Sequence, residues 1–197
     1  ITSGGVAINW ASVGTLTVNG GTIQGASAIN HKSGALAING GVFNGVDAAV
    51  AIETKSGMTA VTAVVITAGT FTSETTDAVV STSADVNVGA MSHFITGGTF
   101  SSNVEELVAL GYKVEANGDG TFSVVRDESQ TYVAQIGTKY YTSFTEAIAA
   151  LTQPMSELVL LEDITLTELV KLETKATTLN LNGHTVTANC KKAFEVW

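Results

Sequence analysis

The chain has 197 residues and a formal net charge of −9, with 14% charged and 45% hydrophobic residues. This composition excludes a globally disordered chain, and the nine basic residues form no cluster of the kind that binds nucleic acid. A single cysteine, Cys190, excludes a disulfide within the chain and a cysteine-rich metal site. No apolar run is long enough to cross a membrane, so we expect no membrane insertion.

A short phrase recurs four times in the first part of the chain. The copies are Leu16–Ile23, Leu36–Phe43, Val64–Phe71 and Phe94–Phe100. The glycine before the last dipeptide stands at positions 21, 41, 69 and 98, so the second and third intervals are longer than the first. A strand, a glycine turn and another strand at such a period predict an all-β fold, a right-handed parallel β-helix. Each coil of such a solenoid buries its apolar face against its neighbours.

Alternation of apolar and polar residues predicts which side chains stack. Period-two alternation places Leu16, Val18 and Ile23 on the same inward line as the matching residues one coil later, which are Leu36, Ile38 and Phe43. The first interval, from Gly21 to Gly41, has the length of one coil. The two longer intervals therefore predict loops that bulge from the coils around residues 53–62 and 81–92.

Residues 101–126 are predicted to end the repeat array. Ser102 and Glu105 form a capping box before an amphipathic helix, and Gly111 is placed to end that helix. Two apolar strands then flank residues 117–120, Asn-Gly-Asp-Gly, which is a strong hairpin signal. We expect the helix and hairpin to form a lid over the open end of the β-helix, so the first domain is residues 1–126.

The second predicted domain, residues 127–197, begins with a polar link at 127–131. A hairpin follows with its turn at Gly137–Thr138, and Ser143 caps a helix that runs from Phe144 to Leu151. Short apolar strands come next, at residues 158–161, 164–166, 169–172 and 179–183. This order predicts an opening hairpin, a helix and the first coils of a second β-helix.

The two ends of the sequence resemble each other. Residues 193–197, Ala-Phe-Glu-Val-Trp, echo residues 6–10, Val-Ala-Ile-Asn-Trp. One interpretation is that the sequence is about one module of a tandem array, cut inside a coil at both ends. Chance similarity between two such short segments is the other, and the sequence leaves both open.

These motifs resemble those of bacterial extracellular right-handed parallel β-helix repeat proteins, which are adhesin-like cell-surface proteins. The resemblance rests on the Asn-Gly-Gly repeats, on residues 95–125 as a terminal segment, and on residues 141–148, 160–166 and 179–186 as the opening of a further β-helix. It implies an extracellular or cell-surface location, by secretion or wall attachment, and a structural or adhesive role. The implied partners are neighbouring repeat modules, copies of the chain end to end, and host or polymer glycans.

Parallel β-helices also include polysaccharide lyases and hydrolases, which gives a catalytic alternative. Asp47 and Asp77 precede corresponding strands and are candidates to stack on one face, with Glu53, Glu74 and Asp85 nearby in other turns. A lyase needs a basic residue beside such carboxylates, yet residues 1–100 contain no arginine, and His31 and His93 are isolated. We therefore predict a protein that is not an enzyme, with no cofactor and no metal site.

Carbohydrate binding is the better-supported site hypothesis. Sugar rings stack on exposed aromatic side chains, and the candidates are Trp10, Tyr140, Tyr141 and Trp197. Because Tyr140 and Tyr141 alternate, one of the two rings should face outward. The alternative is that both tryptophans pack against neighbouring coils. The sequence thus predicts a non-catalytic structural or adhesive segment, with an end-to-end fibre subunit and a polysaccharide-active protein as alternatives.

Overall fold

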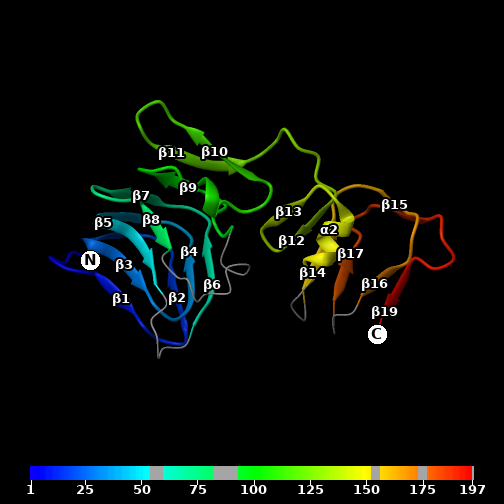
Figure 1. Ribbon diagram of the computed structural model, residues 1–197, viewed down its shortest axis with the longest axis horizontal. Coiled ribbons are helices and arrows are strands. Elements are labelled where there is room, and N and C mark those ends of the chain that lie inside the picture. Colours follow the sequence, from blue (N-terminus) through cyan, green and yellow to red (C-terminus); the bar gives the residue numbers. More distant parts are fainter. Residues whose placement is uncertain (54–59, 82–92, 152–155, 173–176, 197) are drawn as a thin grey trace. The chain divides into compact units, whose positions relative to one another are not determined.

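The computed structural model describes residues 1–53, 60–81, 93–151, 156–172 and 177–196. The described chain is mostly β, with largely parallel sheets, and it divides into two compact units, Ile1–Arg126 and Asp127–Trp197. Figure 1 shows both units. The strands of the first unit are β1 (Ile8–Trp10), β2 (Thr15–Val18), β3 (Thr22–His31), β4 (Gly34–Ile38), β5 (Val42–Ile52), β6 (Val61–Ile66), β7 (Thr70–Ser73), β8 (Val79–Ser81), β9 (Gly98–Phe100), β10 (Tyr112–Ala116) and β11 (Phe122–Arg126).

Two sheets build the first unit. The larger has the strand order β1-β3-β5-β7-β9-β11-β10, with β8 also paired to β5, and the smaller has the order β2-β4-β6. All pairs from β1 to β9 are parallel, so successive passes of the chain lie side by side in the same direction (Figure 1). The predicted stacking is confirmed, since Leu16 pairs with Leu36, Val18 with Ile38 and Ile23 with Phe43.

Equivalent apolar side chains form columns inside this unit. Ile38 pairs with Val18 on one side and with Ile66 on the other, and Ile66 is bridged to Ile95. A second column consists of Phe43, Phe71 and Phe100, all fully buried, whose rings stack in parallel with centroids 4.8 Å apart. Burial of each such side chain stabilises the fold by about 1.5–3 kcal/mol. The columns explain why the repeat keeps apolar residues at these positions.

The Asn-Gly-Gly segments form the corners between the two sheets. Asn39 Nδ2 donates a hydrogen bond of 2.8 Å to Asn19 Oδ1, and Thr67 takes the equivalent position one pass later. Gly41 has a φ of +119°, and a Cβ there would lie 3.0 Å from the peptide oxygen of Gly21. Only glycine suits this corner, because its conformation is left-handed and the neighbouring pass is close.

The end of the first unit differs from the prediction. The expected helix after Ser102 is wrong, because the segment forms only one 3-10 turn, Glu105–Leu107, and then bridges in parallel from Val108 to Ile95. The Ser102 hydroxyl does not cap this turn and instead accepts a hydrogen bond from the peptide nitrogen of Ala78. A tertiary contact thus replaces the local capping box.

The predicted hairpin that follows is confirmed as β10 and β11. The two strands are antiparallel, with Val114 opposite Val124. β11 also pairs antiparallel with β9, with Phe122 opposite Phe100. The hairpin therefore extends the larger sheet beyond β9.

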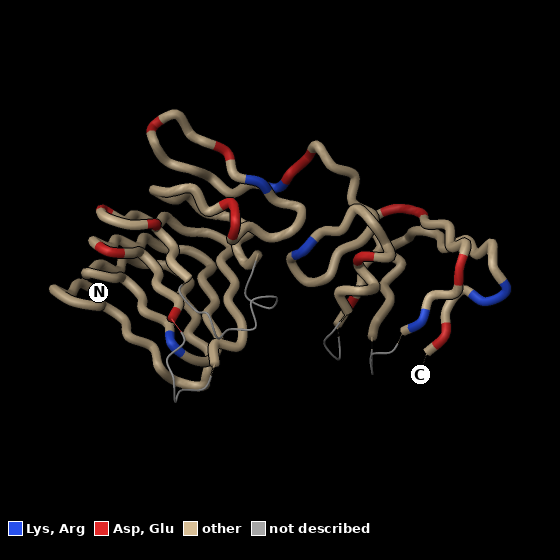
Figure 2. The backbone as a smooth tube through the Cα atoms, viewed as in Figure 1, with Lys and Arg blue, Asp and Glu red and all other residues tan. Residues whose placement is uncertain are grey.

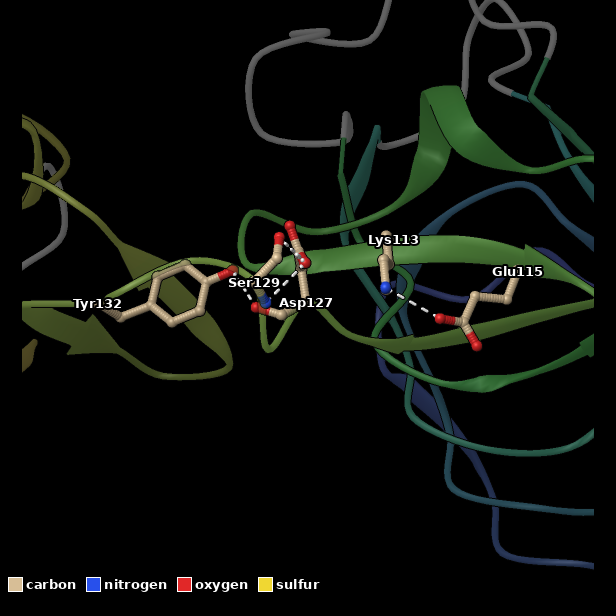
Figure 3. A network of polar contacts seen from close by, with 5 residues as sticks. All are labelled: Lys113, Glu115, Asp127, Ser129 and Tyr132. Atoms are coloured by element: carbon tan, nitrogen blue, oxygen red, sulfur yellow. Dashed lines mark hydrogen bonds and ion pairs between the residues drawn. The ribbon is translucent and has the colours of Figure 1, made fainter.

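The second unit begins with a folded turn in place of an open polar link. Asp127 Oδ1 accepts hydrogen bonds from the peptide nitrogen and the hydroxyl of Ser129, and the Tyr132 hydroxyl donates to the peptide oxygen of Asp127 (Figure 3). Figure 3 also shows the exposed pair Lys113–Glu115 on β10 of the first unit, at 2.9 Å. Exposed pairs of this kind add little stability.

The remaining elements of the second unit largely follow the prediction. Ser143 caps the helix α2 (Phe144–Ala149), which ends slightly before the predicted Leu151. The strands are β12 (Ala134–Ile136), β13 (Lys139–Tyr141), β14 (Glu157–Leu160), β15 (Ile164–Leu166), β16 (Val170–Leu172), β17 (Thr178–Asn180), β18 (Val186–Ala188) and β19 (Phe194–Val196).

Parallel pairing recurs in this unit. β12 and β13 form the predicted hairpin, and β12 also pairs antiparallel with β14. Three parallel pairs follow, with Leu158 opposite Leu179, Thr165 opposite Thr187 and Lys171 opposite Glu195. The strands β14, β15 and β16 thus pair, in chain order, with β17, β18 and β19 of the next pass.

Candidate functional site

The aromatic candidates occupy different parts of the fold. Tyr141 on β13 belongs to the core of the second unit and is only 7% exposed, and its burial raises the pKa of the phenol. Tyr140 is half-buried, and its ring lies 5.4 Å from the ring of Tyr132. Trp10 is half-buried at the end of β1, and Trp197 lies outside the described residues. Within the second unit, Tyr141 therefore offers no exposed ring on which a sugar could stack.

Asp47 and Asp77 are both exposed, but they do not stand at equivalent positions. The peptide oxygen of Asp47 accepts hydrogen bonds from the hydroxyls of Ser73 and Thr76, and Asp77 is the next residue along the chain. Asp77 lies 30 positions after Asp47, whereas the paired residues before and after this segment are 28 and 29 positions apart. Phe43 on β5 pairs with Phe71, whereas Val50 on the same strand pairs with Val79, so the register moves by one position between the two pairs.

Asp77 borders an open hollow of about 540 Å³ in the first unit. Its polar lining consists of Asp77, Ser81, Asn103, Glu105 and Glu106, and Val79, Val104 and Leu107 contribute apolar surface. Among the described residues this lining has three carboxylates and no basic side chain, so it attracts cations or hydroxyl groups. The sequence did not reveal this hollow, because residues 102–106 have the local pattern of a helix start.

A second hollow, of about 460 Å³, lies in the second unit. Phe144 and Ile148 on α2 line it together with Ile164, Leu166 and Val170, and Glu168 and Lys171 contribute opposite charges. Such a lining suits an aliphatic group.

Buried polar atoms without hydrogen-bond partners concentrate at one corner of the first unit. In the described part of the chain these atoms are Trp10 Nε1, Asn30 Oδ1, His31 Nδ1 and Ser33 Oγ. His31 and Trp10 are paired in register, and His31 is 0% exposed. Unpaired buried polar atoms are rare in folded proteins, so this corner is the chemically most unusual place in the described chain.

Charge is sparse over both units. Figure 2 shows scattered acidic positions and few basic ones. Among the described residues, no three histidine, cysteine, aspartate or glutamate side chains come together to hold a metal ion. The described helices also include none with the length and hydropathy of a membrane span. Glu53 is half-buried and Glu74 is exposed, while Asp85 lies outside the described residues, as do most of the predicted loops at 53–62 and 81–92.

Comparisons of the chain with protein families, curated proteins and solved structures found no match.

Proposed function

We propose that this chain is a non-catalytic structural segment of an extracellular surface protein, built as a right-handed parallel β-helix over residues 1–126 with the first coils of a second β-helix over residues 127–197. The observation that carries the proposal is the column Val18, Ile38, Ile66 and Ile95. These four residues are in register across consecutive passes of the chain.

This arrangement suits a stiff spacer. Each pass is tied to the next by a ladder of backbone hydrogen bonds, and the passes share buried side chains such as Phe43 and Phe71. In a stack of this kind each layer is stabilised by its immediate neighbours. The outer surface is left free to vary, so such a segment presents or extends a binding surface without needing a deep pocket.

Pulling on single molecules tests the mechanical role. With handles at residues 1 and 126, we expect a discrete rupture event, because the parallel ladders between passes must break together. The Ile38→Ala variant should rupture at a lower force, and Val42→Ala, which alters an exposed side chain on β5, serves as its matched control. Gradual extension at low force without a rupture would contradict the stiff-spacer proposal.

Chemical assays separate this proposal from the polysaccharide-active alternative. The chain is incubated with uronate polymers and neutral glycans, with and without Ca²⁺, and reducing ends and unsaturated products are measured. We expect no product of either kind; for the lyase reaction the reason is that the described lining of the acidic hollow beside Asp77 includes no basic side chain to abstract a proton. Product that disappears in an Asp77→Asn variant would replace the structural proposal with a catalytic one.

A further inference from the structure

His31 stands between two apolar residues in the column of paired strand ends. It ends β3, and its register partners are Trp10 on β1 and Ile52 on β5. Parallel neighbours in register point to the same face of a sheet, so the imidazole lies in one column with the indole and an isoleucine. The His31 side chain is fully buried, as is that of Ile52.

The hydrogen bonds of His31 fix the form of its ring. Nε2 lies 3.3 Å from the peptide oxygen of Gly34, which only accepts, so Nε2 carries the proton of the neutral imidazole. Nδ1 then carries the lone pair, and it is buried without a partner among the described residues. Protonation would add a second N–H and a positive charge at a buried nitrogen that has no hydrogen-bond partner among these residues.

The described strands around His31 place no carboxylate where it would compensate such a charge. β1 and β4 contain no titratable side chain, and β5 contains only Asp47, five residues before Ile52. Among the described residues, Lys32 and Glu53, directly after β3 and β5, are the charged groups nearest to His31 and its partner Ile52 along the chain. Glu53 Oε2 accepts a hydrogen bond from Asn30 Nδ2. Because neighbouring residues of a strand point to opposite faces, Asn30 holds this carboxylate on the face away from the imidazole.

The backbone at Gly34, three residues after His31, packs closely against the preceding pass. Gly34 has a φ of +72°, and a Cβ there would clash with the peptide oxygens of Ser12 and Gly14 in the preceding pass. The corner of residues 31–34 is therefore pressed directly against the corner of residues 10–14. A change at His31 acts on the contact between these two passes.

We propose that this corner is an acid-labile joint, at which protonation of His31 loosens residues 1–18 from β3 and β4. Burial lowers the pKa of His31, and its hydrogen bond to Gly34 partly opposes that shift. The loosened chain takes up the proton more readily than the packed one. Packing is therefore strongest above the ordinary histidine pKa of about 6.5 and weakens as the pH falls below it.

Trp10 serves as the reporter, because a Trp197→Phe variant makes it the sole indole of the chain. Its fluorescence is followed from pH 7.5 to about pH 4.5, and amide hydrogen exchange is measured over the same range after correction for the intrinsic rate. We expect the emission to shift below about pH 6.5. Exchange in residues 2–18 should rise by up to about tenfold per pH unit while exchange in β7 stays constant.

Controls identify the titrating group. His31→Gln keeps a donor for Gly34 without titrating and should abolish both changes. Glu53→Gln should leave them in place, as should the double variant His93→Asn with His184→Gln. If His31→Gln does not fold, the double variant still leaves His31 as the sole histidine, and its imidazole resonance should titrate in step with the Trp10 signal.

Three results would overturn the proposal. One is a wild-type Trp10 signal that does not change with pH. Another is a change that persists in His31→Gln or does not follow the imidazole resonance. The third is a loss of protection that appears at once in β5 and β7, which would indicate global acid unfolding and no local joint.

Discussion

Truncation of Ile38 to alanine examines the column on which the fold of the first unit depends. Ile38 is 0% exposed and is held between Val18 and Ile66. The change removes most of a buried side chain from a site with neighbours on both sides, so little collapse is possible, and the expected cost is about 2–5 kcal/mol in the free energy of unfolding. Because stacked passes stabilise their neighbours, the loss should concentrate in β2, β4 and β6.

The assay is urea unfolding followed by circular dichroism, combined with hydrogen exchange resolved by peptide. Val42→Ala is the matched control, since Val42 is 38% exposed on β5 and its replacement should cost less than about 0.5 kcal/mol. The reasoning is refuted if the two variants are equally stable. It is also refuted if the exchange of β2 and β6 is unchanged in Ile38→Ala.

Three further predictions address a corner, a cap and a buried phenol. Gly41→Ala should lower the free energy of unfolding by at least about 1 kcal/mol, because it places a Cβ at a φ of +119° beside the peptide oxygen of Gly21. The control is Gly4→Ala, whose Cβ meets no atom within 4 Å. Equal melting temperatures of the two variants would contradict the expectation. Ser143→Ala should destabilise the second unit by about 0.5–2 kcal/mol in urea unfolding, whereas Ser143→Asp should keep the cap, and a loss as large in Ser143→Asp would argue against capping. Burial disfavours the Tyr141 phenolate, so the folded pKa lies above the unfolded value of about 10 and stability falls as the pH rises beyond it. Tyr141→Phe should remove a phenol that ionises above about pH 10 in an ultraviolet titration, and a titration curve unchanged in that range would exclude the assignment.

The parallel pairing of the strands could be predicted because short sequence patterns determine it. The repeat interval and the alternation of Leu16 and Val18 define both the partner and the face of each residue, and the observed pairs follow them. The hairpin of β10 and β11 and the Ser143 cap were likewise encoded in a few adjacent residues.

Features that depend on distant contacts could not be predicted. Ser102 has the local pattern of a helix cap, but its hydroxyl binds the peptide nitrogen of Ala78 in an earlier part of the chain. Asp47 and Asp77 were aligned because each precedes a corresponding strand, but Asp47 stands three residues before Val50 and Asp77 only two residues before its partner Val79. Such a displacement is invisible until the strands are paired.

His31 is an intermediate case. The segments ending at Trp10, His31 and Ile52 share the same alternation, so the repeat itself indicates that His31 points inward. In the sequence it nevertheless stands as an isolated histidine, because no other residue of catalytic or metal-binding type lies close to it in the chain. Among the described residues, the lack of a charged partner beside the buried imidazole is what gives the corner its chemistry.

The reversal of direction at β11 limits how the first unit can change in length. An antiparallel strand presents its peptide groups to β9 in a different pattern from the one that β7 presents on the other side. Duplication or deletion of one whole pass between β5 and β9 would therefore lengthen or shorten the unit by about 4.8 Å and leave the terminal hairpin on the same kind of edge. Variation by whole passes would change the length of the first unit in equal steps, and the hairpin of β10 and β11 would still end the larger sheet.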